Sequence, residues 1–280
     1  MNESRTPEPD PFTGLPDEIV ATYVDPDTGL TNLVHRDIAW QQMTRESPRF
    51  AEEFDRTFKA DVDEISREYA IATGIIRLGG ANVADEADFE VHVRCGAILQ
   101  NALVTVLGGL ELLRRGYVLQ PSILVRSCIE AVATVFDVFR HEESRTRLMS
   151  GNYDSSDSIG RAKKLFRIIG PLYGRLSKSY THIGEAHWTA TAFSSTSAEA
   201  REQLVTLKAA IALVSLAVEL VHHQSVQSPR YWKPHPDGNG VIFHPDANDV
   251  AVLKDFVRIK SDGAAQEEPE RLDLSDDDER

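Results

Sequence analysis

The chain has 280 residues, of which 41% are hydrophobic and 26% charged, the composition of a globular protein with a sizeable core. Two cysteines, Cys95 and Cys128, are too few for a disulfide framework or a four-thiolate zinc site. Without a basic-then-apolar leader, the chain is expected to be cytoplasmic and to have no membrane partner. Collagen, coiled-coil rods, disulfide-rich secreted folds and membrane proteins are excluded at this level.

The net charge of −14 is concentrated at the two ends. Residues 1–18 carry −4 and residues 261–280 carry −7, which leaves −3 for residues 19–260. Segments this charged bury too little apolar surface to offset the entropy of ordering. We therefore expect a disordered leader over residues 1–18, a single helical domain over 19–262 and a disordered acidic tail over 263–280.

The first elements predict a small β-hairpin. Apolar residues at 19–24 and 30–34 flank Asp25-Pro-Asp-Thr-Gly29, a run of turn-forming residues in which Gly29 can adopt a positive φ.

Helical periodicity then dominates the chain. Apolar residues at three- and four-residue spacing predict an amphipathic helix over residues 49–78 and a second helix over 85–115. In the second, Gly108-Gly109 allows either close packing or a kink. A third helix, over 120–142, begins with Pro121 in its first turn and is apolar nearly all round, so it is expected to lie centrally.

The second half of the chain is also mainly helical. A loop at 150–158 is followed by basic helices over 158–169 and 171–182, and Ser197 caps a helix over 198–226 whose apolar run of ten residues is too short to cross a bilayer. A short strand at 241–243 and a helix over 246–260 complete the prediction. The fold class is therefore an all-α bundle of about five long helices with an N-terminal β-hairpin.

Residues 158–184 contain no acid and six cations, in contrast to the rest of the chain. Such a segment can attract phosphate, or it can be a solvated helix face whose cations pair with acids elsewhere. For the first alternative, the nucleic-acid-binding candidates are Arg161, Lys163, Lys164, Arg167 and Lys178.

The third helix carries Arg126 and Glu130, which lie four residues apart on one helix face. On so apolar a helix, neither charge can be buried alone without a large free-energy cost. The pair is expected either to be a buried structural pair or to orient a site in a cleft.

A third polar group follows in the basic segment, where Arg175, Ser179 and His182 share one helical stripe beside an apolar one. A guanidinium, a hydroxyl and an imidazole in this arrangement can bind a phosphodiester and transfer a proton. The alternative is the last turn of an ordinary helix, whose histidine only hydrogen-bonds its neighbours.

No cofactor or metal is expected. His182 and His187 are five residues apart, too far around a helix to share an ion, and zinc there would require a loop. Glu219 and His222 have the Glu-x-x-His spacing of di-iron bundles, but only one copy occurs. No glycine-rich phosphate loop or nucleophile elbow is found.

An arginine followed a few residues later by a histidine in a small helical bundle resembles the HEPN superfamily, over about residues 85–226. The Arg126-x-x-x-Glu130 helix before Leu176-Ser177 and His182 also resembles a group of uncharacterised bacterial helical proteins. The resemblance implies a metal-independent ribonuclease of a bacterial toxin–antitoxin or phage-defence system, usually dimeric, with RNA and an antitoxin or regulatory protein as partners. The polar residue that usually follows the arginine is Leu176 here.

On this interpretation Arg175 and His182 are the catalytic residues, and Ser179, Arg126 and Glu130 orient them. The competing hypothesis is a non-catalytic interaction or scaffold protein in which the Arg126–Glu130 pair and His182 are structural.

Overall fold

A computed structural model describes residues 16–80, 86–165, 169–178, 187, 194–234, 236 and 241–244. The described chain is mostly helical with a small antiparallel hairpin at its N-terminal end, which confirms the helical fold class and the hairpin. Both expected tails and the expected helix over 246–260 lie outside the described residues.

The hairpin forms as predicted. Strand β1 (Ile19–Val24) pairs with β2 (Thr31–His35), with Thr22 opposite Leu33 and Val24 opposite Thr31. In the turn, Asp25 Oδ1 accepts hydrogen bonds from the backbone N–H groups of Asp27 and Thr28, both at 2.9 Å, and Gly29 adopts a φ of +67°. The hairpin leads into α1 (Ile38–Gln41) and a π-helical turn, η1 (Gln42–Glu46).

The helix expected over residues 49–78 is two helices, so that prediction was wrong at its centre. Helices α2 (Ser47–Thr57) and α3 (Lys59–Gly79) are separated at Phe58, whose φ of −116° and ψ of 24° leave the helical region. The Phe58 side chain remains buried and packs on Phe54, with ring centroids 4.9 Å apart. Hydrophobic periodicity continues through the break, because both helices bury their apolar sides in the same core.

Helices α4 (Glu86–Arg114) and α5 (Gln120–Arg140) match their predicted ranges closely and pack along each other. Helix α4 is continuous through its glycine pair, which serves close packing instead of a kink. A Cβ added at Gly109 would lie 2.9 Å from Leu207 Cδ2, whereas one at Gly108 would meet only Leu124, at 3.9 Å. The two neighbouring glycines therefore face opposite environments, one the core and one the surface.

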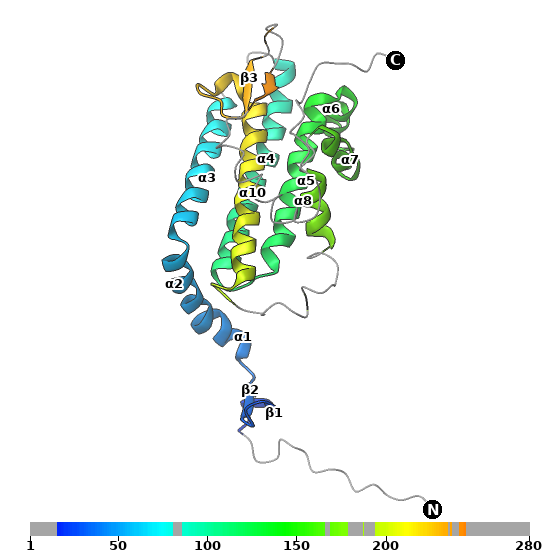
Figure 1. Cartoon of the computed structure of the whole chain (residues 1–280). Coiled ribbons are helices and arrows are strands. Elements are labelled where there is room, and N and C mark those ends of the chain that lie inside the picture. The colour runs from blue at the N-terminus through cyan, green and yellow to red at the C-terminus, as the bar shows by residue number, and fades with distance from the viewer. Residues whose placement is uncertain are drawn as a thin grey trace, which may run out of the picture.

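Helix α10 (Ala198–Val221) is the centre of the bundle and is in contact with α3, α4 and α5 (Figure 1). Its N-terminus is capped as predicted, since Ser197 Oγ accepts a hydrogen bond from the Ala200 N–H at 3.2 Å. The predicted helix continued to residue 226. Instead α10 ends at Val221, and a short 3-10 turn, η3 (His223–Ser225), follows.

Shorter helices cover the outer side of α5 (Figure 1). They are α6 (Glu142–Met149), α7 (Ser156–Leu165) and α8 (Ile169–Leu176), and α6 was not predicted because its sequence is almost entirely polar. The expected strand at 241–243 is present as β4 (Val241–Phe243), paired with β3 (Trp232–Pro234).

Two described helices, Phe89–Arg114 and Ala198–Val221, are long and apolar enough to cross a membrane by length and composition. The apolar window of the second is 83% buried inside the bundle, as in the core helix of a soluble fold, whereas that of the first is 44% buried. Helix α4 therefore keeps an apolar side outside the core.

Candidate functional site

Arg126, Glu130 and Tyr173 form a hydrogen-bonded cluster where α8 packs on α5. Arg126 Nη2 and Nε donate to the Tyr173 hydroxyl at 2.7 and 3.2 Å, and Arg126 Nε lies 3.3 Å from Glu130 Oε1. The Tyr173 hydroxyl in turn donates to Glu130 Oε1 at 3.0 Å. The side chains of Arg126 and Glu130 are 28% and 33% exposed, so this cluster, here called the open cluster, is accessible to solvent.

The electrostatics of the open cluster keep Arg126 charged. Burial lowers the pKa of the Arg126 guanidinium, but the hydrogen bond to Tyr173 and the charge of Glu130 outweigh that effect and raise the pKa above its ordinary value. The guanidinium carbon also lies 4.9 Å from the centroid of the Tyr173 ring, a cation–π distance. The arginine is therefore a fixed cation held by an acid and an aromatic ring.

Helix α8 places Tyr173 and Arg175 on different sides. Leu172 and Leu176 are fully buried and form the apolar face of the helix. Residues two apart on a helix differ by about 200°, and Arg175 accordingly forms its ion pair with Glu202 of α10 while Tyr173 contacts α5. The Arg175 side chain is only 7% exposed.

The predicted site residues are therefore brought together only in part. Arg126 and Glu130 meet each other and Tyr173, whereas Arg175 is held by an acid of the central helix. Ser179 and His182 lie outside the described residues, as does Arg167 of the basic segment.

A second polar cluster, formed by Asp137, Tyr153 and Arg161, lies where α7 packs on α5. The Asp137 side chain has no solvent exposure, and it accepts hydrogen bonds from Arg161 Nη2 and from the Tyr153 hydroxyl, both at 2.7 Å. Burial raises the pKa of Asp137, but the bonds from Arg161 and Tyr153 outweigh it and hold that pKa below its ordinary value. Burial beside this carboxylate raises the pKa of Tyr153 to about 12. We call this the closed cluster.

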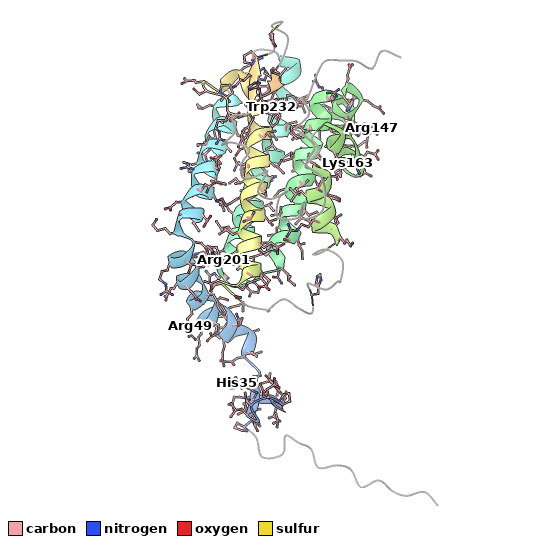
Figure 2. The ribbon with its side chains drawn as sticks, viewed as in Figure 1. His35, Arg49, Arg147, Lys163, Arg201 and Trp232 are labelled. Carbon is pink, nitrogen blue, oxygen red and sulfur yellow. The ribbon has the colours of Figure 1, made fainter. Side chains whose placement is uncertain are left out.

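The exposed cations of the basic segment are lysines. Lys163, Lys164 and Lys178 are exposed, and Lys163 lies on α7 at the side of the bundle opposite α3 (Figure 2). Arg161, by contrast, is engaged by Asp137. Of the expected phosphate-binding residues that the structure describes, these three lysines are exposed, whereas Arg161 is partly exposed and paired with Asp137.

Sequence reasoning missed Tyr173, Asp137 and Glu202, which partner the predicted arginines. The sequence could have indicated Asp137, because it is the one acid within the apolar run 135–139 of a central helix. A carboxylate in that position must be paired when it is buried. Tyr173 and Glu202 give no comparable signal, since their partners come from other helices.

Two further polar features near the C-terminal end of α10 are structural. Glu219 is buried, accepts the backbone N–H groups of Arg230 and Tyr231 at 3.0 Å, and thereby anchors the segment that leads to β3. His222, at the end of α10, is buried against Gly79 and Gly96. Its burial lowers its pKa to about 4, so it is neutral at neutral pH.

Among the described residues, no group of three or more His, Cys, Asp or Glu side chains could hold a metal ion. Cys95 and Cys128 are both buried, and burial raises the pKa of each thiol to about 12, which makes them poor nucleophiles. A cavity of about 270 Å³ lies between α3 and α10. Four of its five charged lining residues form ion pairs, Lys208 with Glu64 and with Asp61 nearby, and Arg230 with Glu68; the fifth is Arg67.

Comparison of the chain with protein-family models, curated proteins and solved structures gave no match.

Proposed function

We propose that this protein binds RNA at the open cluster and cleaves it without a metal ion. One observation carries the proposal: a guanidinium, a carboxylate and a phenol are hydrogen-bonded to one another on a partly exposed surface, beside the acid-free basic segment. Ionisable groups whose pKa values are shifted by specific partners, as that of Arg126 is by Tyr173 and Glu130, cluster at binding and catalytic sites.

Arg126 is the phosphate-binding group in this proposal. Its described hydrogen bonds use Nε and Nη2, so the remaining nitrogen, Nη1, is available for a phosphate oxygen. Arg126 takes the role first expected of Arg175, because Glu202 occupies the Arg175 guanidinium and the Arg175 side chain is buried.

The chemistry is an in-line attack of the RNA 2′-hydroxyl on the adjacent phosphorus. Glu130 accepts the 2′-hydroxyl proton as the O2′–P bond forms, and Arg126 stabilises the charge that develops on the phosphate oxygens. His182, which enters on sequence grounds alone, protonates the departing 5′-oxygen as the P–O5′ bond breaks. The products are a 2′,3′-cyclic phosphate and a 5′-hydroxyl.

Lys163, Lys164 and Lys178 extend the site by attracting the RNA backbone. Each contact with a phosphate releases counterions, so RNA binding should weaken steeply as salt concentration rises. The HEPN resemblance places such an activity in toxin–antitoxin or phage-defence systems, where an antitoxin or regulatory protein would control it.

The test is incubation of purified protein with mixed cellular RNA in the presence of EDTA. Wild type should cleave, whereas Glu130→Gln and His182→Ala should each lose about 100-fold or more in rate, the usual effect of removing a general base or acid. Glu143→Gln is the matched control, because Glu143 and Arg147 form the same four-residue pair on α6, away from the site. Undiminished cleavage by both site variants would exclude this site.

A non-catalytic interaction protein is the second candidate, and a separate observation favours it. Arg161 and Arg175, two of the six cations in the basic segment, form ion pairs within the fold, with Asp137 and Glu202. A wild-type protein that neither binds nor cleaves RNA would support this candidate over the first.

A further inference from the structure

The N-terminal arm, defined as residues 19–43, exposes a large amount of apolar surface. It comprises the hairpin, α1 and the first turn of η1. Eight of its large apolar side chains are more than half exposed, namely Val20, Tyr23, Val24, Leu30, Leu33, Ile38, Trp40 and Met43. Single exposed apolar side chains are ordinary, but eight within 25 residues are typical of a segment that binds a partner.

The arm is held away from its own bundle. Helices α1, η1 and α2 follow one another without an intervening loop and carry the hairpin beyond the end of the bundle (Figure 1). A two-stranded hairpin is only marginally stable in water on its own. Burial of these exposed side chains therefore needs a surface other than the described part of the same chain.

The bundle has an exposed apolar surface of its own, here called the α4–α5 patch. At its centre, Val104 and Ile123 are exposed on either side of Gly108, where a Cβ would meet nothing but Leu124. Residues 95–110 of α4 contain no charged side chain. Since α4 is only 44% buried over its apolar window, part of this uncharged stretch of α4 lies at the surface.

We propose that the arm of one copy of this chain docks on the α4–α5 patch of a second copy, and that the exchange is reciprocal. The two surfaces are both apolar, and two arm–patch contacts related by a two-fold axis form a closed dimer. The arm presents on the order of several hundred Å² of apolar surface. Two such contacts reach the ~800 Å² per partner of a standard interface.

Charge favours this arrangement over direct arm-to-arm contact. Residues 17–37 carry five acids and a single arginine, so two arms packed together would repel each other. The α4 side of the α4–α5 patch carries no charge over residues 95–110 and imposes no such repulsion. This inference does not depend on the proposed ribonuclease function.

Light scattering coupled to size exclusion gives the first test, with protein at about 100 µM, well above the micromolar dissociation constant expected of a modest interface. Wild type should show twice the chain mass. An arm variant, Leu33→Ser with Trp40→Ser, and a patch variant, Val104→Glu, should each show the mass of one chain. Leu78→Ser is the control, since Leu78 is as exposed as Trp40 but lies in neither surface, and it should stay dimeric.

Disulfide cross-linking between two copies tests whether the arm of one copy contacts the α4–α5 patch of the other. Leu33→Cys protein is mixed with differently tagged Val104→Cys protein and oxidised, with the native cysteines buried. A disulfide-linked heterodimer is expected, in excess over either homodimer. A monomeric wild type, or a dimer that survives Val104→Glu but not the arm variant, would overturn the proposal.

Discussion

Two polar clusters join the basic helices to α5, and they differ in the exposure of the acid, since their arginines are similarly exposed, Arg161 at 34% and Arg126 at 28%. In the closed cluster, Asp137 has no exposed surface and is bonded to both Tyr153 and Arg161. In the open cluster, Arg126, Glu130 and Tyr173 have the same three chemical types, but the acid, Glu130, is 33% exposed.

The difference indicates different roles for the same chemistry. A fully buried acid must be satisfied by fixed partners, so the closed cluster specifies how α7 packs on α5. Partly exposed ion pairs contribute little to stability, so the open cluster adds little to the packing of α8 on α5. This contrast is the reason for assigning substrate binding to the open cluster.

The largest expected effect is in the closed cluster. Asp137→Ala leaves the Arg161 guanidinium and the Tyr153 hydroxyl without their shared acceptor and should lower the free energy of unfolding by about 3 kcal/mol. This value is at the low end for a broken buried pair because Arg161 is partly exposed and can reach water. Urea unfolding measures the change, and a loss below about 1 kcal/mol would mean that Asp137 is not an anchor.

The same residue predicts a dependence of stability on pH. Because the pKa of Asp137 is below its unfolded value of 3.8, its carboxylate stabilises the fold above that value, and the stabilisation is lost as pH falls through the folded pKa. In Asp137→Asn this contribution to the acid sensitivity is absent. Urea midpoints measured from pH 6 down to about pH 2 should therefore fall less for the variant than for wild type; parallel curves would contradict the assignment.

The two tyrosines offer a matched comparison. Tyr153→Phe removes a hydrogen bond to a buried charge and should lower the free energy of unfolding by about 1.5–3 kcal/mol. Tyr173→Phe removes bonds in a solvent-accessible cluster and should cost less than about 1 kcal/mol. Thermal unfolding of the two variants side by side measures the difference, and equal losses would remove the distinction between the clusters.

The smallest expected effect is the coupling between Arg126 and Glu130. A double-mutant cycle of Arg126→Ala and Glu130→Ala should give about 0.2–1 kcal/mol, the range of exposed pairs. The sequence alone left a buried pair open, and such a pair would show a cost of about 3–5 kcal/mol for either single change. A value in that range would mean that the open cluster is structural.

Much of the fold follows from local sequence signals, and much of the site does not. The hairpin, the Ser197 cap and the ranges of α4 and α5 depend on turn residues and periodicity within one segment, and they are found as predicted. The pairing of Arg126 with Glu130 is also local, because both lie on one helix face.

Contacts between helices were not predictable in this way. The partners of Arg161 and Arg175 lie on α5 and α10, and their identity depends on how the helices pack. The break at Phe58 was missed for a related reason, since tertiary burial of Phe54 and Phe58 preserves the hydrophobic pattern across a change in backbone direction.

The most direct test of the central claim is RNA affinity measured at two salt concentrations for wild type, Arg126→Ala and Arg147→Ala. Arg147 is the control, an exposed arginine paired with Glu143 on α6. If the open cluster binds phosphate, Arg126→Ala should weaken binding by about tenfold and reduce the salt slope by about 1, with the fold intact by circular dichroism. Arg147→Ala should change affinity by less than about twofold. Wild-type affinity and salt slope in a folded Arg126→Ala protein would contradict the account.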